Sequence, residues 1–361
     1  MEQRHTGEDA YFAASNSEKG FYSYYSACFD AARIKRVFAI KGGPGTGKSR
    51  FMREVAEAGR RSGWRAEYVY CSSDPDSLDG VILTGHGDCL ALLDATAPHV
   101  YEPKNPGVRE ELIDLGAFWD RERIVEHADE IRVLTRQKSE AYRRAYRYLG
   151  AEGSMLRVRR ELVAPYLRRA AIQSYAEKQM REIPAGQGYA VQPALLRSVG
   201  MRGEVIFDTY FASAEQTLLL EDCYGSAQVF LETVGQLAVK KKLAIRVSHD
   251  PVYPDELDGI FLVEARRAFV VKPARLELPA NARVLSLRRF TDVAGMRKIR
   301  GRLRFAERMR ASMRQGALEA LGEVREVHFA LEQFYINAMD FAAKENFTKR
   351  FCEKLFGLQN G

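Results

Sequence analysis

The segment that most limits the possible folds of this chain is Gly42-Gly43-Pro44-Gly45-Thr46-Gly47-Lys48-Ser49. A glycine, four further residues and then Gly-Lys-Ser form the pattern of a phosphate-binding loop. Arg36–Ile40 before it favours a buried parallel strand, and Phe51–Ala56 after it favours a helix. Because loops of this type join a strand to a helix, the sequence predicts an α/β nucleotide-binding core.

The residue types in this loop fit a phosphate ligand. Glycines allow successive backbone amides to turn toward an anion without clashes from side chains. Lys48 is expected to reach the β- and γ-phosphates and to act in catalysis, and the Ser49 hydroxyl is expected to bind Mg²⁺. We therefore assign residues 42–49 to nucleotide binding.

Two further strands are predicted, over Ala66–Cys71 and Cys89–Asp94. Asp94 ends an apolar run, which is where a carboxylate that holds a metal-bound water is expected. Asp94 is therefore the candidate second metal residue and a candidate catalytic residue. The alternative is a capping aspartate at a junction between strand and loop.

Between these strands, Asp74, Asp76 and Asp79 stand within six residues of one another. At the carboxyl end of a strand, such carboxylates could orient an attacking water, hold a hydroxyl substrate or extend the metal shell. An Asp-Pro turn with helix capping explains them equally well. His99 is expected near the same end of the sheet, where it is either a catalytic or a structural histidine.

The second half of the chain resembles the first. Leu218–Leu231 aligns without gaps on Phe38–Phe51 at an offset of 180, and 46% hydrophobic residues suffice for two cores. Further matches in the same order pair segments on either side of the loop. They are Tyr210–Ser213 with Tyr11–Ala14, Ser248–Pro251 with Ser73–Pro75, Leu257–Ile260 with Leu78–Val81, and Ala268–Val271 with Leu90–Leu93. The chain is therefore interpreted as an internal duplication.

The second copy has lost the chemistry of the loop. In this alignment Asp222 replaces Gly42, Ala227 replaces Gly47, Gln228 replaces Lys48 and Val229 replaces Ser49, while Lys272 stands near the place of Asp94. We predict that the second half binds no Mg-nucleotide in the usual way. The Asp-Pro and Leu-Asp-Gly elements persist there, which weakens a catalytic role for Asp74 and Asp79. Asp76 has no counterpart and keeps its candidacy.

Each core is predicted to be followed by helices. Apolar residues recur at helical spacing over residues 120–181 and 292–356, with breaks at Gly150–Gly153, Gln315–Gly316 and Gly322. The predicted organisation is a nucleotide-binding core at 1–120, an Arg-rich helical extension at 121–182, a degenerate core at 183–290 and a C-terminal helical extension at 291–361. Ile183–Gly203 is expected to connect the halves.

The basic charge is confined to the predicted helices. Residues 121–181 carry a net charge of +7 and residues 297–314 another +7, so the rest of the chain carries −7 of the total of +7. Such blocks could contact phosphates or nucleic acid, or could be solvated helix faces. They mark a surface whose partner the sequence leaves open.

Cysteine usage and hydropathy predict the compartment. The cysteines Cys28, Cys71, Cys89, Cys223 and Cys352 are scattered and never form a Cys-x-x-Cys pair. This pattern excludes a disulfide framework and a cysteine zinc site. No segment has the roughly 20 apolar residues of a membrane helix, and residues 1–5 lack the apolar stretch of a signal peptide. We therefore expect a cytoplasmic protein with no membrane partner.

Lys41–Ser49, Cys71–Gly80 and Asp94–His99 together resemble uncharacterised bacterial P-loop ATPase-like proteins built from two tandem halves. The resemblance covers nearly the whole chain, and it implies a P-loop NTPase-type parallel sheet with flanking helices in each half. It also implies ATP and Mg²⁺ as ligands. Members of that family commonly carry an intact second loop, which this chain lacks.

The leading hypothesis is a slow ATPase with one intact phosphate loop, whose nucleotide state changes the contact between the halves. Lys48, Ser49 and Asp94 would act as above, Asp76 or Asp74 would orient the nucleophile, and Arg143 or Arg144 would supply transition-state charge. One alternative is a small-molecule kinase whose Asp74-Pro75-Asp76 segment binds an acceptor hydroxyl. Another is a non-enzymatic, nucleotide-gated module that binds partners, including nucleic acid, through the basic helices.

Overall fold

The computed structural model describes residues 2–4, 9–99, 101–222, 224–273, 277 and 279–357, so Cys223 lies outside the described residues. The first half contains β1 (Glu2–Arg4), β2 (Asp9–Phe12), β3 (Ala14–Ser17), β4 (Gly20–Ser23), α1 (Tyr25–Cys28), β5 (Arg36–Lys41), α2 (Lys48–Arg61), β6 (Arg65–Tyr70), β7 (Leu78–Gly85), β8 (Asp88–Asp94) and β9 (Glu110–Asp114). It continues with η1 (Leu115–Phe118), α3 (Arg121–Glu126), α4 (Ala128–Val163), η2 (Ala164–Tyr166) and α5 (Arg169–Arg181).

The second half repeats this order. It contains β10 (Ala190–Pro193), β11 (Arg197–Gly200), β12 (Gly203–Phe207), α6 (Thr209–Ser213), β13 (Gln216–Glu221), α7 (Ala227–Lys240), β14 (Ala244–His249), β15 (Leu257–Leu262), β16 (Arg267–Val271) and β17 (Ala282–Ser286). It ends with η3 (Leu287–Phe290), η4 (Gly295–Ile299), α8 (Arg300–Ala338) and α9 (Phe341–Phe356). Strands β10 and β11 occupy much of the segment that the sequence analysis treated as a connection between the halves.

Each half forms one six-stranded sheet, and the two sheets have the same strand order. The orders are β2-β6-β7-β8-β5-β9 and β10-β14-β15-β16-β13-β17. The predicted duplication is therefore confirmed at the level of topology. Strand β2 corresponds to β10, so the predicted match of Tyr11–Ala14 with Tyr210–Ser213 is wrong, because Tyr210–Ser213 lie in α6.

The sheets are mixed rather than parallel, which corrects the predicted sheet type. Strand β7, which was not predicted, runs antiparallel to β6 and β8. The reason is local: His86 and Gly87 both have positive φ angles, of 52° and 76°, between the two strands. Two left-handed residues make the tight turn that suits a hairpin, so the chain returns beside β7 instead of crossing over the sheet.

The pairing of strands and turns corrects the predicted register of the duplication. Residues 42–47 separate β5 from α2, whereas residues 222–226, one residue fewer, separate β13 from α7. Ser49 Oγ accepts a hydrogen bond from the Leu78 amide, and Gln228 Oε1 accepts the corresponding bond from the Leu257 amide. Gln228 therefore stands at the place of Ser49, and Ala227 at the place of Lys48.

The register also changes the partners of Asp94 and of the acidic loop. Asp94 pairs with Ile40 on β5, and Val271 pairs with Leu220 on β13, so Val271 rather than Lys272 stands at the place of Asp94. The amides of Cys71 and Asp250 bond to the carbonyl oxygens of Ser77 and Glu256, both at 2.9 Å. Asp250 therefore corresponds to Cys71, not to Asp74, so its persistence is no argument about Asp74.

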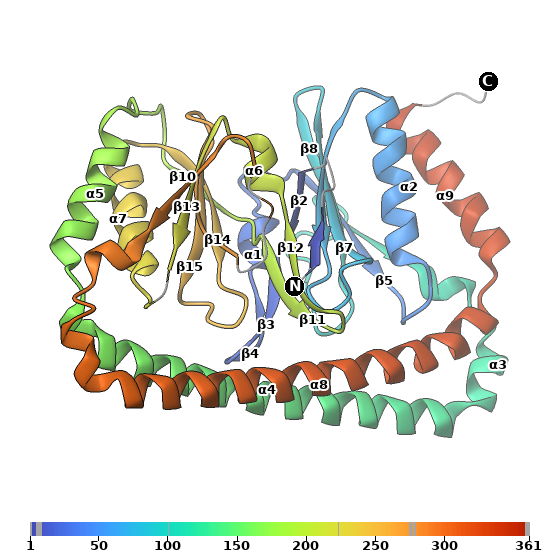
Figure 1. The fold of residues 1–361 in the computed structure, drawn as a ribbon. Coiled ribbons are helices and arrows are strands. Elements are labelled where there is room, and N and C mark those ends of the chain that lie inside the picture. The colour runs from blue at the N-terminus through green and yellow to red at the C-terminus, as the bar shows by residue number, and fades with distance from the viewer. Residues whose placement is uncertain are drawn as a thin grey trace.

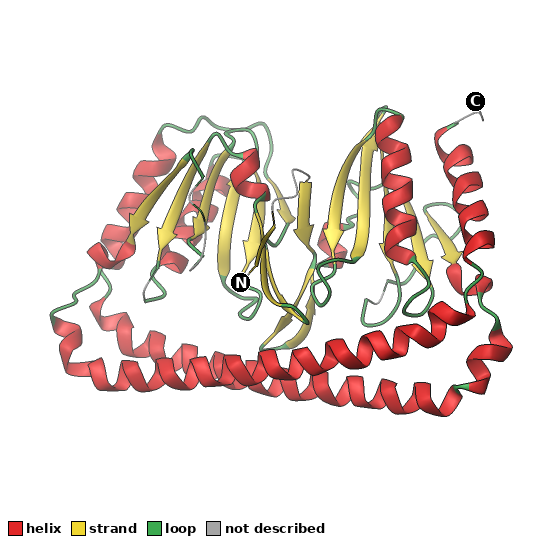
Figure 2. Cartoon of the chain, turned by 45° about the vertical axis from the view of Figure 1, so that its right-hand side comes forward, coloured by secondary structure: helices red, strands yellow, loops and turns green. Residues whose placement is uncertain are grey.

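The sheets lie face to face with helices on their outer sides (Figures 1 and 2). A shared core between them contains Val37, Ala39 and Leu93 from one sheet and Leu219 and Val270 from the other. Outside the first sheet, Phe51, Met52 and Val55 of α2 are fully buried, at the spacing of one helix face. The loop before α2 is therefore anchored to a rigid sheet.

The terminal helices are exchanged between the halves. Helix α5 follows the first core but packs on α7, where Ile172, Ala176 and Met180 join the second core. Helix α9 follows the second core but packs on α2, with the Phe351 ring 5.3 Å from that of Phe51. The long helices α4 and α8 span the distance between the cores side by side in Figure 1.

Helices α4 and α8 form an antiparallel pair, here called the helix pair α4/α8. Contacts run in opposite directions along the two helices, from Lys138 with His328 to Glu152 with Arg314. The predicted breaks at glycine are wrong, because both helices are continuous there. A Cβ atom at Gly153 would lie 1.7 Å from Glu18 Oε2, and one at Gly316 would lie 2.9 Å from Tyr148, so close packing explains these glycines.

Among the residues that the structure describes, no helix is both long and apolar enough to cross a membrane.

Candidate functional site

The phosphate-loop segment joins β5 to α2 in the predicted order of strand, loop and helix. Gly42, Gly45 and Gly47 have φ angles of 144°, 73° and 77°, and Gly47 caps α2. These angles are readily adopted only by glycine. Thr46 is fully buried and its hydroxyl donates to the Gly43 carbonyl oxygen at 3.0 Å. The sequence therefore fixes a loop that ends at the positive end of a helix.

Lys48 and Asp94 come together at this loop. Lys48 Nζ donates to the carbonyl oxygens of Gly42 and Gly43 at 3.0 and 2.8 Å and lies 3.6 Å from Asp94 Oδ2. Burial raises the pKa of Asp94, against the opposing effect of the Lys48 charge. Thr96 donates its amide to Asp94 Oδ1 and its hydroxyl to the Gly42 carbonyl oxygen. A carboxylate and an ammonium group thus face the same end of the sheet.

The acidic loop after β6 is engaged by arginine. The Asp76 carboxylate forms an ion pair with Arg202, whose Nε lies 3.9 Å from Asp74 Oδ1. Asp74 also accepts a hydrogen bond from the Ser77 hydroxyl at 2.8 Å. Arg202 lies in the turn between β11 and β12, so Asp74 and Asp76 link the first half to the second.

Helix α8 covers the loop. A Cβ atom at Gly45 would lie 2.8 Å from Ile336 Cγ1, and one at Gly43 would lie 3.2 Å from Tyr335 Cε1. Burial raises the pKa of the Glu332 carboxyl, against the opposing effect of the nearby Gly45 amide. An acidic side chain from the C-terminal part of α8 thus lies near a backbone donor of the loop.

Helix α4 adds a cation that the sequence analysis missed. Lys138 is half-buried, and its Nζ lies 2.9 Å from His328 Nδ1. Burial lowers the pKa of Lys138, and the nearby charge of Lys48 lowers it further. Arg143 and Arg144 are exposed, and Arg144 pairs with Glu323 instead. Helical spacing alone gave no signal, because the face of α4 that meets the loop depends on how α8 packs.

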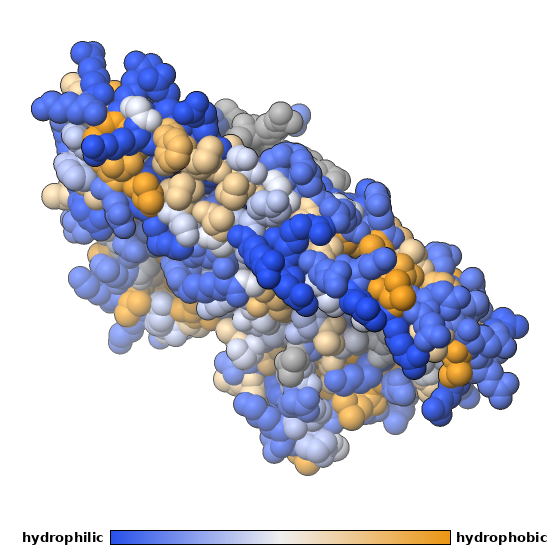
Figure 3. Space-filling model, turned by 90° about the horizontal axis from the view of Figure 1, so that it is seen from below, coloured by the Kyte–Doolittle hydropathy of each residue, from blue (hydrophilic) through white to orange (hydrophobic). Residues whose placement is uncertain are grey.

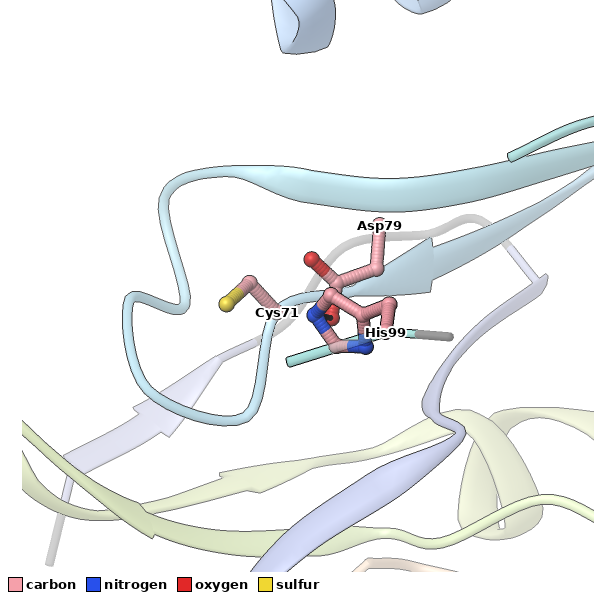
Figure 4. A group of neighbouring side chains, drawn as sticks. All are labelled: Cys71, Asp79 and His99. Atoms are coloured by element: carbon pink, nitrogen blue, oxygen red, sulfur yellow. Dashed lines mark ion pairs between the residues drawn. The ribbon is translucent and has the colours of Figure 1, made fainter. Parts of the chain in front are cut away.

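A second group of side chains lies close to Asp94, because Gly80 on β7 pairs with Leu93 on β8. Cys71, Asp79 and His99, here called the Cys71 cluster, offer ligand atoms that all lie within 4.8 Å of one another (Figure 4). His99 Nε2 lies 3.2 Å from Asp79 Oδ2, and both side chains are buried. Burial lowers the pKa of His99, but the Asp79 carboxylate raises it. The pKa of His99 therefore lies above its ordinary value. His99 was predicted near the same end of the sheet as Asp79, which the structure bears out, whereas Cys71 was not a predicted site residue.

The loop of the second half has filled its own anion site. Asp222 Oδ1 accepts hydrogen bonds from the amides of Tyr224 and Ser226 at 2.9 and 3.0 Å, and from the Ser226 hydroxyl at 3.0 Å. Asp222 Oδ2 accepts one from the Ala227 amide at 3.2 Å. The Asp222 carboxylate therefore occupies the amides of its own loop.

The basic blocks meet on the helix pair α4/α8, where part of their charge is neutralised. Glu152 is fully buried and pairs with both Arg310 and Arg314. Arg160 pairs with Glu256, and Arg157 pairs with Glu18 at 2.6 Å. Figure 3 shows the face that carries the helix pair, which is mostly hydrophilic with separate hydrophobic patches. Several arginines of these blocks therefore hold the helices to the cores.

A groove of about 910 Å³ lies between α3 and the facing surfaces of α4 and α8. Its lining includes His127 from the junction of α3 and α4, Val133 from α4, and Phe334 and Asn337 from the face of α8 opposite Glu332 and Tyr335. The groove is thus separate from the phosphate loop.

Comparison of the chain with protein-family models, with curated proteins and with solved structures finds no match.

Proposed function

We propose that this protein binds one Mg-nucleoside triphosphate, ATP by the resemblance of its motifs, at residues 42–49 and hydrolyses it slowly. The observation that supports this most is the loop itself, whose left-handed glycines precede α2 and whose Lys48 lies beside Asp94. The second loop supports one site per chain, because Asp222 occupies its amides and Ala227 stands at the place of Lys48.

The residues present fit a Mg-nucleotide. Lys48 bonds to two carbonyl oxygens that a phosphate oxygen could replace as its partner. The Ser49 hydroxyl and the Asp94 carboxylate would hold Mg²⁺, which when bound neutralises charge on the phosphates. Asp94 is buried beside a cation, so its carboxylate is placed to hold a water through a hydrogen bond.

Nucleotide binding would act on the helix pair α4/α8. The Glu332 carboxylate lies near the Gly45 amide, and a phosphate at that amide would compete with it. Lys138 lies near Lys48 and would gain a phosphate partner in place of neutral His328. Because Glu332 and His328 lie on α8 while Lys138 lies on α4, occupancy would be coupled to the contact between these helices.

The test is nucleotide binding and phosphate release by purified protein with Mg²⁺ and ATP. Lys48→Ala removes a charge-assisted contact worth about 1.5–3 kcal/mol, so we expect affinity to fall about 10- to 100-fold and phosphate release to be lost. The control is Lys35→Ala, whose side chain is exposed. Equal binding and release by wild type and Lys48→Ala would refute the proposed site.

A second variant tests the coupling to α8. Glu332→Gln removes the negative charge that faces the Gly45 amide, so we expect ATP affinity to rise by about two- to tenfold. Glu323→Gln is the matched control, because Glu323 is an exposed glutamate of the same helix that pairs with Arg144. Unchanged or weaker affinity in Glu332→Gln, relative to this control, would contradict competition between the carboxylate and phosphate.

A further inference from the structure

The Cys71 cluster combines three ligand types in a buried place. Cys71 follows β6, Asp79 lies on β7 and His99 follows β8, so three segments of the sheet converge there (Figure 4). His99 is 5% exposed, and its Nδ1 has no hydrogen-bond partner among the described residues. The Tyr25 ring stacks on the imidazole at 4.7 Å, which holds its orientation. The other ring nitrogen, Nε2, lies 3.2 Å from Asp79 Oδ2, so it is the atom that His99 offers to a ligand shared with Asp79.

The duplicated half provides an internal comparison. Asp250 and Asp258 occupy the places of Cys71 and Asp79, and both bind one cation, the Arg197 guanidinium. Arg197 Nη2 lies 3.0 Å from Asp250 Oδ2 and 2.6 Å from Asp258 Oδ1. In the first half the strand that corresponds to β11 is β3, which begins at Ala14 where β11 begins at Arg197. The first half therefore keeps one of the two carboxylates, as Asp79, has the Cys71 thiol in place of the other, and has Ala14 in place of the arginine.

We propose that Cys71, Asp79 and His99 bind a divalent transition-metal ion of the zinc class, which supplies the cation that Arg197 supplies in the second half. This proposal does not rest on the proposed nucleotide activity, because none of the three residues belongs to the phosphate loop.

The donor set selects the class of metal. A thiolate, an imidazole and a carboxylate match zinc and its neighbours, whereas Mg²⁺ and Ca²⁺ prefer oxygen ligands. Ligand atoms around tetrahedral zinc lie roughly 3.3–3.8 Å apart for bonds of about 2.0–2.3 Å, so a small contraction from the present separations suffices. The absence of Cys-x-x-Cys pairs excludes zinc sites built from cysteine pairs. This cluster contains a single cysteine, so that argument does not apply to it.

In this proposal Cys71 is a metal ligand and not a nucleophile. Metal binding would release the thiol proton to solvent and leave the thiolate paired with the metal.

The test uses the full-length protein after treatment with a chelator and titration with Co²⁺ and then Zn²⁺. We expect one Co²⁺ per chain with a thiolate-to-cobalt charge-transfer band, which Zn²⁺ displaces. Cys71→Ser is expected to lose the band and to weaken Zn²⁺ binding by at least about 100-fold. Cys352→Ser, a half-buried cysteine on α9, is the control and keeps both. Lys48→Ala also keeps both, which separates this proposal from the nucleotide site.

A second measurement does not depend on the folding of any variant. Zn²⁺ is expected to slow alkylation of Cys71 in the wild-type protein at least tenfold, measured by mass spectrometry, while Cys352 reacts at an unchanged rate. No charge-transfer band in the wild type, a band retained in Cys71→Ser, or equal protection of both cysteines would each overturn the proposal.

Discussion

His328 shows how much the surroundings of one residue can change its chemistry. Burial lowers the pKa of His328 to about 4, and the charges of Lys138 and Lys48 contribute. The neutral imidazole accepts a hydrogen bond from Lys138, and its other nitrogen lies 3.6 Å from Glu332. One histidine thus lies between the cation of α4 and the carboxylate near the Gly45 amide.

This shift predicts a pH dependence of stability. Between pH 6.5 and about pH 4 the unfolded chain binds a proton at His328 that the folded chain does not, so stability falls as pH drops through this window. Relative to wild type, His328→Gln should gain about 1–3 kcal/mol in unfolding free energy from pH 7 to pH 4. Urea denaturation at several pH values measures this. Parallel curves for wild type and His328→Gln would contradict it, and the exposed His127→Gln is the control.

At the scale of elements, the two copies of the strand–loop–helix unit differ at the N-terminus of the helix. In α2 the N-terminal amides follow glycines with positive φ, and in α7 they bond to Asp222. In the second copy a carboxylate of the chain satisfies amides at the helix N-terminus, whereas in the first copy we propose that a nucleotide phosphate takes this place. The loss of Lys48 and Ser49 in the second copy accompanies this internal anion.

The internal anion should stabilise the second core. Asp222→Ala removes the acceptor of four hydrogen bonds, so we expect a loss of about 2–3 kcal/mol in unfolding free energy. Asp340→Ala, which removes one capping bond to the Ala343 amide of α9, should cost about 1 kcal/mol. Denaturant titration compares the two variants. Equal losses would mean that Asp222 acts as an ordinary cap. Asp222→Ala should gain no second ATP site, so we expect it to bind one ATP per chain, as the wild type does.

At the scale of the whole molecule, each half lends its last helix to the other. Helix α5 joins the core around α7, and α9 packs on α2, while the helix pair α4/α8 joins the two ends. Because each core is completed by a distant part of the chain, the halves are expected to depend on each other for stability. The phosphate loop itself is covered by residues of α8, some 290 positions away in sequence.

Because α5 and α9 each pack on the core of the other half, substitutions in them are expected to affect opposite cores. Phe351→Ala on α9 should weaken the protection of amides in α2, and Met180→Ala on α5 should weaken the protection of amides in α7. Each loses a buried apolar contact worth about 2 kcal/mol, so local exchange rates should rise about 30-fold. Hydrogen exchange with mass spectrometry reads both helices in each variant. Loss of protection in α2 for Met180→Ala, with α7 unchanged, would contradict the exchanged packing.

The sequence by itself predicted the strands β5, β6 and β8, the loop between β5 and α2, and the duplication. These features depend on residues close in the chain: an apolar run, glycines that permit positive φ, and a repeated order of elements. The one-residue difference between the loops was missed because Leu218–Leu231 aligns by letter without a gap. Only the hydrogen bonds of Ser49 and Gln228 establish the correct register.

Tertiary structure decided what surrounds the loop. Strand β7 was not predicted, because Asp74 and Asp76 shortly before it and Asp79 within it favour a loop. Gly153 and Gly316 resembled helix breaks, but they permit close contacts with Glu18 and Tyr148. Lys138, Glu332 and the Cys71 cluster gave no local signal, because their proximity comes from the packing of α8 and the order of the strands. Spacing along the chain predicts which backbone forms, whereas long-range packing determines which side chains meet.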